Sequence, residues 1–98
     1  MIRGWIGFDG VLLSDDLSMK ALGGSFADRT RLSLEAGCDV VLHCNGDPKE
    51  MEQIAAACPV LTPAAQRRVA AGEARRGRPA PFDAREAAAA LDALLANA

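Results

Sequence analysis

The fold of this chain is decided by Gly7-Phe8-Asp9-Gly10-Val11-Leu12-Leu13-Ser14-Asp15-Asp16-Leu17-Ser18-Met19, a short apolar run that ends on two adjacent carboxylates. The turn pair Asp9-Gly10 precedes the apolar residues, and the run is too short for a helix. It therefore predicts a buried strand over about Val11–Ser14. In α/β proteins, ligands and chemistry lie at the carboxyl ends of parallel strands. The pair Asp15-Asp16 is thus the first candidate for function.

A second short run of β-branched and apolar residues, Asp39–Cys44, predicts another buried strand. Between the two strands, a loop over Asp16–Ser25 leads to a helix expected at about Phe26–Ala36. Ser25 is a candidate cap for the start of this helix, and Gly37 stands where a C-cap glycine belongs. Strand, helix and strand form one βαβ unit over about residues 10–45, with parallel strands and a right-handed crossover.

Beyond this unit the pattern is helical, over about residues 47–98. Asp47-Pro48 and Thr62-Pro63 are typical helix openings, in which an N-cap residue is followed by proline in the first turn. A last helix is rich in alanine and follows a linker of glycine and proline. The predicted helices cover about 48–57, 64–75 and 84–96, and the linker covers 77–81.

Length and composition limit the class of protein. Half of the 98 residues are hydrophobic, and the net charge of −2 gives no electrostatic footprint for nucleic acid or an anionic membrane. No apolar run approaches the roughly 20 residues that span a bilayer, and the first residues have no signal-peptide pattern. The odd number of cysteines, in apolar surroundings, indicates reduced thiols. We expect a cytoplasmic α/β protein with no nucleic-acid or membrane partner; its cysteines are Cys38, Cys44 and Cys58.

Two parallel strands cannot form a complete sheet, because each expects neighbours on both edges and cover on both faces. Apolar residues ahead of the first strand also need a partner surface. We therefore expect the chain to be the C-terminal part of a larger α/β domain, whose other strands lie upstream. The apolar residues ahead of the strand are Ile2, Trp5, Ile6 and Phe8.

Asp15 and Asp16 are expected to point to opposite sides, since successive side chains alternate along an extended backbone. Asp15 shares the side of Val11 and Leu13 and is the carboxylate that would project into a cleft at the strand end. Asp16 is expected to bond backbone amides of the loop Leu17–Ala21. From position alone, Asp15 could be a nucleophile, a general base, a metal ligand or a cap for the loop.

Several strings of this sequence resemble the bacterial family 3 glycoside hydrolases. Within that family they look closest to the cytoplasmic β-N-acetylhexosaminidases of peptidoglycan recycling (NagZ type). The resemblance covers about residues 2–47 and fades in the helical tail. A lone Ser-Asp pair would be a weak sign, whereas the combined strings are specific: Ile2-Arg3-Gly4, Gly7–Val11, Ser14–Ala21, Gly24–Arg29 and Ala36–Asn45.

The resemblance implies a (β/α)8 TIM barrel, with this chain as its seventh and eighth strands and last helices, a partial catalytic domain over residues 1–98. The family's nucleophile is the Asp that follows Ser at the end of strand seven, which maps onto Asp15. Its carboxylate would attack the anomeric carbon, and water would then cleave the glycosyl-enzyme. The implied substrate is terminal β-linked N-acetylglucosamine, as in N-acetylglucosaminyl-anhydromuramyl peptides. No cofactor or metal is implied.

The chain also departs from the family pattern. The general acid/base of this subfamily is a His–Asp pair on a mobile loop, within a Lys-His-Phe-Pro-Gly-His-Gly type motif that is absent here. The sole histidine, His43, lies within the predicted second strand and does not match that motif. A missing general acid alone typically costs ~10²–10⁴-fold in rate. We therefore expect the chain to be inactive alone and to need an N-terminal barrel segment as its partner.

Other residues have ordinary structural interpretations. His43 and the cysteines lack the spacing of a zinc site, and a histidine in an apolar strand is typically a satisfied core residue. Trp5 lies ahead of the strand, at the end opposite Asp15, which favours packing over stacking on a sugar. Five arginines near the linker are typical of a solvated helix face and not of a phosphate site. They are Arg67, Arg68, Arg75, Arg76 and Arg78.

Two alternatives stay open at this stage. A receiver-like signalling domain would use paired acids at a strand end to hold Mg²⁺, but it needs a further strand-end Asp and a Lys from a later strand. A non-catalytic interaction piece, stable only with a complementary fragment, is compatible with the resemblance. It differs from the enzyme interpretation only in whether this 98-residue chain acts by itself.

Overall fold

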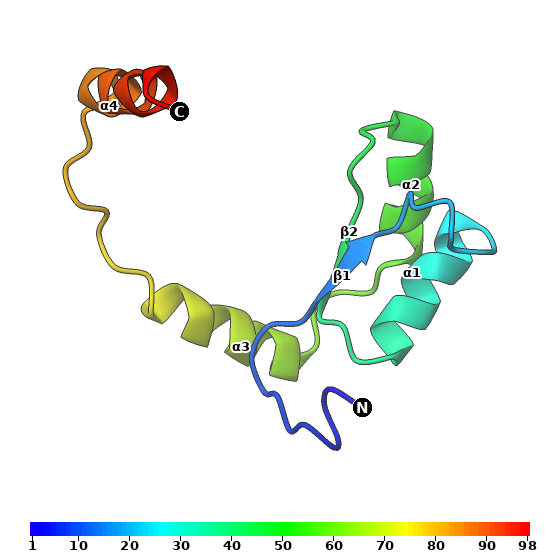
Figure 1. The fold of residues 1–98 in the computed structure, drawn as a ribbon. Coiled ribbons are helices and arrows are strands. Elements are labelled where there is room, and N and C mark those ends of the chain that lie inside the picture. Colours follow the sequence, from blue (N-terminus) through cyan, green and yellow to red (C-terminus); the bar gives the residue numbers. More distant parts are fainter.

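The computed structural model describes residues 1–98, which form two strands and four helices in the order β1-α1-β2-α2-α3-α4 (Figure 1). Strands β1 (Leu13–Asp16) and β2 (Val40–Leu42) pair in parallel. Helix α1 (Phe26–Glu35) connects them and packs against β2 and against α2 (Pro48–Ala57). The βαβ unit is therefore present as the sequence predicts.

Each helix begins at a capping residue, and for the first three helices the cap is the one that the sequence indicates. At the first turn of a helix the backbone N–H groups lack partners, and a side-chain oxygen of the cap residue accepts from one of them. Gly37 has φ +109° just after α1, a conformation that favours glycine, as predicted for a C-cap position. The cap residues are Ser25 for α1, Asp47 for α2, Thr62 for α3 (Pro63–Ala74) and Asp83 for α4 (Ala84–Ala96).

The strands differ in extent from the predicted ones. The first was expected at Val11–Ser14 but runs two residues further along, and the second is shorter than Asp39–Cys44. Leu13 is the register partner of Val40, and Asp16 is the partner of Leu42, so β1 advances three residues where β2 advances two. This is a β-bulge, in which one strand carries an extra residue. The pairing thus extends into the polar end of the run, where the apolar pattern gives no sign of a strand.

The core of the chain is small. Only Leu17, Thr30, Ile54 and Ala65 are buried. Thr30 is buried on the inner face of α1, where its hydroxyl donates to the Phe26 carbonyl at 2.7 Å. The expected packing of Trp5 is wrong for this chain, because the residue is 85% exposed on the N-terminal segment with no element covering it. Many other large apolar side chains are also exposed, on both strands and on every helix except α3.

Helices α3 and α4 extend away from the βαβ unit. Figure 1 shows α3 running away from the strands and α4 standing apart at the end of an extended linker. The bounds of α2, α3 and α4 agree with the predicted ones to within one residue. None of the four helices is long and apolar enough to cross a membrane.

We expect the isolated chain to give a helical circular dichroism spectrum without a sharp thermal transition. A cooperative melt requires many mutually supporting buried contacts, and here four residues are buried. The measurement is ellipticity against temperature at a concentration where the chain is monomeric by ultracentrifugation. A steep, reversible transition of the monomer would contradict this expectation.

Candidate active site

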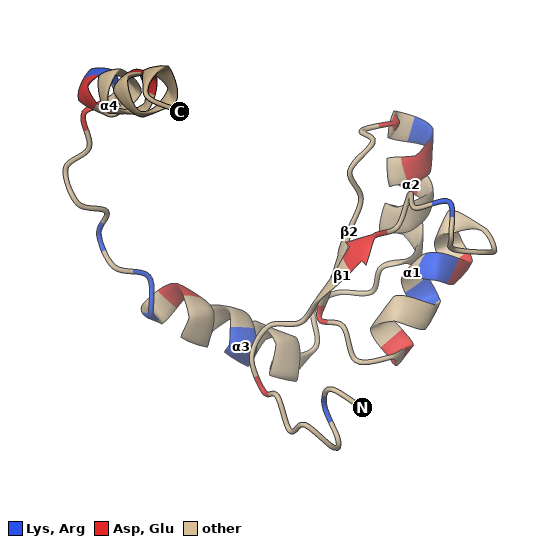
Figure 2. Cartoon of the chain, viewed as in Figure 1, with Lys and Arg blue, Asp and Glu red and all other residues tan.

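Charged side chains gather at both ends of the strand pair. The arrowhead of β1 has the colour of acidic residues in Figure 2, and the strand ends on Asp15 and Asp16. Asp39 immediately precedes β2 and lies at the opposite, amino end. The two ends differ in whether their carboxylates form ion pairs with arginine side chains.

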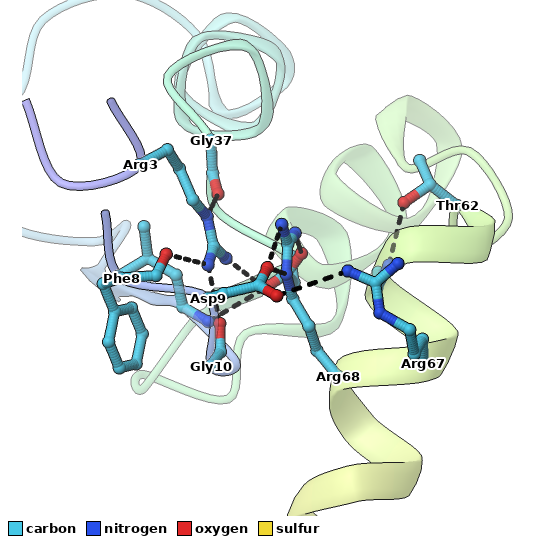
Figure 3. Close-up of polar contacts among 11 residues, drawn as sticks. Arg3, Phe8, Asp9, Gly10, Gly37, Thr62, Arg67 and Arg68 are labelled. Atoms are coloured by element: carbon cyan, nitrogen blue, oxygen red, sulfur yellow. Dashed lines mark hydrogen bonds and ion pairs between the residues drawn. The ribbon is translucent and has the colours of Figure 1, made fainter. Parts of the chain in front are cut away.

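Both oxygens of the Asp39 carboxylate accept hydrogen bonds. Its side chain is 4% exposed, and Oδ2 accepts from the Leu12 amide at 2.9 Å and from the Arg3 guanidinium. Its Oδ1 accepts from Arg68 Nη1 at 2.8 Å, and Arg68 also donates to Asp9 at 2.9 Å (Figure 3). Burial raises the pKa of Asp39, but the Leu12 amide and the two guanidinium groups outweigh it and hold the pKa below its usual range.

This network joins three separate segments of the chain. Arg3 donates further to the carbonyls of Phe8 at 2.9 Å, Gly10 at 2.7 Å and Gly37 at 3.2 Å, which holds the N-terminal segment at the amino end of the strands (Figure 3). Arg68 attaches α3 to the same carboxylate. Because every charge has a partner, we interpret the network as a structural joint.

The joint corrects one prediction. The arginines near the linker were expected to form a solvated face, but Arg68 is 17% exposed and ion-paired with two carboxylates. Arg67 is 64% exposed and lies 3.5 Å from Asp9. The remaining three arginines of the group are exposed, as expected.

At the carboxyl end, Asp16 caps the ends of both strands. Its Oδ1 accepts from the backbone amides of Ser18 at 2.9 Å and Cys44 at 3.1 Å, and its Oδ2 accepts from the Ser18 hydroxyl at 2.6 Å. The Ser18 hydroxyl and amide bonds hold the pKa of Asp16 below its usual range. The predicted role of Asp16, bonding loop amides, is confirmed.

Asp15 is the available carboxylate at this end. Exposure alternates along β1, with Leu13 and Asp15 exposed and Ser14 and Asp16 half-buried, so the predicted alternation holds. The side chain of Asp15 forms no ion pair, and its Oδ1 accepts one hydrogen bond, from the Asp16 amide at 2.8 Å. One oxygen is therefore held and the rest of the carboxylate faces open space.

His43 differs from its predicted state. It follows β2 instead of lying within it, and its side chain is 8% exposed. The ring meets Phe26 edge-on at 5.3 Å, and Nε2 lies 3.1 Å from Glu50 Oε2. Neither ring nitrogen has a well-formed hydrogen bond, so the expectation of a satisfied core histidine is wrong. The three cysteines are free.

The family model for the N-terminal domain of glycosyl hydrolase family 3 matches residues 1–75. The chain belongs to glycosyl hydrolase family 3. The match ends just beyond α3, whereas the resemblance recognisable from the sequence fades near residue 47. Arg68 and the whole Asp39 joint thus lie within the family region.

Relatives with curated names agree with this family. A "Beta-hexosaminidase" of Aromatoleum aromaticum is 38% identical over 85 residues, which are 85% of this chain and 23% of that protein. Proteins of the same name from Shewanella frigidimarina and Thioalkalivibrio sulfidiphilus are 47% and 52% identical over 46% and 45% of the chain. Those matches cover 14% and 13% of the relatives. No solved structure matches.

Membership of glycosyl hydrolase family 3 implies a TIM-barrel-like α/β fold. The two parallel strands and the helices around them have the α/β character of such a fold, although a sheet of two strands is not a barrel. The receiver-like alternative loses its basis, because the strand-end acids lie within the segment that matches glycosyl hydrolase family 3.

The joint generates a prediction that uses a barrel chimera, in which this chain replaces the matching segment of the Aromatoleum aromaticum protein. Arg68→Met will lower the midpoint of urea unfolding, because it leaves the buried Asp39 carboxylate with one cation fewer. Arg67→Met is the matched control, and its effect will be about three times smaller or less, since exposed pairs contribute little. Equal shifts for the two variants would contradict a structural joint.

Stability of the chimera should also fall in acid. Asp16 and Asp39 have pKa values below the ordinary one, so their contribution is complete above the unfolded pKa of about 3.9 and is lost as the pH falls through the folded values. Urea midpoints measured from pH 7 downward will therefore drop less in Asp39→Asn than in the parent chimera. Parallel curves for the two proteins would show that Asp39 does not carry this dependence.

Proposed function

We propose that this chain carries the nucleophile of a retaining β-N-acetylhexosaminidase, and that the nucleophile is Asp15. The observation that carries the proposal is the contrast between two neighbours. Asp16 is occupied by three hydrogen bonds, whereas Asp15 is exposed, free of cations and placed at the carboxyl end of a parallel strand. The family and the curated relatives support a glycosidase.

In the proposed mechanism, the free oxygen of Asp15 attacks the anomeric carbon while the bond to the leaving group breaks. A general acid outside this chain gives the leaving oxygen its proton. Water then attacks the glycosyl-aspartate and restores the carboxylate, with retention of configuration. The amide of Asp16 donates to Asp15 Oδ1 and holds that oxygen, which leaves Oδ2 as the attacking atom.

The proposed substrate is a terminal β-linked N-acetylglucosamine, as in muropeptides released from peptidoglycan. Curated relatives bear the name "Beta-hexosaminidase", which supports a hexosaminide as the substrate class. We further propose that the protein acts in the cytoplasm and has no nucleic-acid or membrane partner. The net charge of −2 and the free cysteines support this proposal.

We also propose a polypeptide partner, the N-terminal barrel segment that would contribute the first six strands and the acid/base histidine. In this arrangement β1 and β2 are the seventh and eighth strands, and residues 1–98 are part of the catalytic domain. The exposed apolar residues of both strands, Leu13 and Leu42, support it because they require cover. The chain alone is then inactive.

The test compares two carboxylate variants in the barrel chimera. Asp15→Ala will reduce kcat by about 10⁴-fold or more, because it removes the nucleophile, with little change in thermal stability. Asp16→Asn will keep most of kcat and lower the melting temperature, since its hydrogen bonds hold the loop. The assay is release of nitrophenol from an aryl N-acetyl-β-glucosaminide, with thermal melts of each protein.

Equal residual activity in the two variants would contradict the assignment of Asp15. Activity of the 98-residue chain alone would contradict the need for a barrel partner. An inactive chimera that folds with a cooperative melt would favour the alternative in which this chain is a non-catalytic interaction piece.

A further inference from the structure

Ser14 lies within the bulge and its hydroxyl makes two hydrogen bonds, one to β2 and one to the next residue of β1. Its hydroxyl oxygen accepts from the Leu42 amide of β2 at 3.0 Å, and the same hydroxyl donates to the Asp15 carbonyl at 2.8 Å. A serine hydroxyl can do both at once, because it carries one donor and two acceptor lone pairs. The neighbouring strand is thereby connected through Ser14 to the backbone of Asp15.

The Asp15 carbonyl belongs to the same planar peptide unit as the Asp16 amide. That amide donates to Asp15 Oδ1 at 2.8 Å. Fixing the direction of the carbonyl therefore fixes the direction of the N–H that holds the carboxylate. A continuous chain of hydrogen bonds runs from the Leu42 amide through the Ser14 hydroxyl and this peptide to the side chain of Asp15.

The bulge explains why a side chain is needed at this point. Strand β1 advances three residues where β2 advances two, so the strands cannot pair residue by residue between Leu13 and Asp16. The extra residue of a bulge is left unpaired, and its peptide is free to tilt unless another group restrains it. The Ser14 hydroxyl spans the gap and supplies that restraint.

We propose that Ser14 is a positioning residue that holds the carboxylate of Asp15 in its attacking orientation by fixing the peptide between residues 15 and 16. The inference rests on the proposed role of Asp15 as nucleophile. It predicts that the hydroxyl itself is required, because the methyl group of alanine can neither accept from Leu42 nor donate to the Asp15 carbonyl.

The first experiment measures kcat and KM of three variants in the barrel chimera. Ser14→Ala will lower kcat by about 10²-fold, the size of effect that misplacement of a reacting group produces, with KM changed by less than about threefold. Ser14→Thr keeps a hydroxyl and suits a strand, and it will restore kcat to within about tenfold of the parent. Ser18→Ala is the matched control, because it removes a hydroxyl that bonds Asp16 and not the Asp15 peptide. Its kcat will stay within about threefold of the parent.

Three kinetic results would overturn the inference. In the first, Ser14→Ala keeps the parental kcat. In the second, Ser14→Thr is as impaired as Ser14→Ala although its melting temperature matches the parent. In the third, Ser14→Ala and Ser18→Ala lose the same factor in kcat, which would indicate a general structural effect.

Hydrogen exchange of backbone amides gives a readout that does not depend on activity. In Ser14→Ala the amides of Leu42 and Asp16 will both exchange faster than in the parent chimera, and Ser14→Thr will restore their protection. Faster exchange at Leu42 with unchanged exchange at Asp16 would show that the peptide is held by something else. If the parent chimera folds but is inactive, the proposed function fails, while the exchange data still decide whether Ser14 holds the Asp15 peptide.

Discussion

Parallel pairing of β1 with β2 places the paired carboxylate of Asp39 at one end of the strands and the unpaired carboxylate of Asp15 at the other. The amino end is closed by guanidinium groups from the N-terminal segment and from α3. At the carboxyl end, the amides of Leu42 in β2 and of Cys44 after it donate to the side chains of Ser14 and Asp16. One end therefore joins the segments of the chain, and the other leaves the Asp15 carboxylate without a cation.

Local features of the fold were predictable because they depend on neighbouring residues. The caps Ser25, Asp47 and Thr62 and the turn at Gly37 are encoded within a few positions, and the helix bounds follow from them. The opposite orientations of Asp15 and Asp16 were also predictable, since they follow from the alternation of an extended backbone.

Features that depend on distant segments were not predictable in the same way. Arg68 pairs with a carboxylate 29 positions away, and its sequence surroundings resemble an ordinary solvated helix face. Strand β1 extends into polar residues, where the side chains of Ser14 and Asp16 accept hydrogen bonds from the amides of Leu42 and Cys44. A hydrophobic period does not reveal such contacts. His43 sits in an apolar run, yet the strand ends before it and its ring nitrogens lack well-formed hydrogen bonds. Trp5 would pack only if a surface outside the chain covered it.

The most direct test of Asp15 as the nucleophile is to identify the residue that forms the covalent glycosyl-enzyme. The barrel chimera would be treated with a fluorinated N-acetylglucosaminide that reacts quickly and hydrolyses slowly, and the labelled peptide would be sequenced by mass spectrometry. We expect one sugar per protein, attached to Asp15 and absent from Asp15→Ala. A label on Asp16 or on any other residue, or turnover without a covalent intermediate, would contradict it.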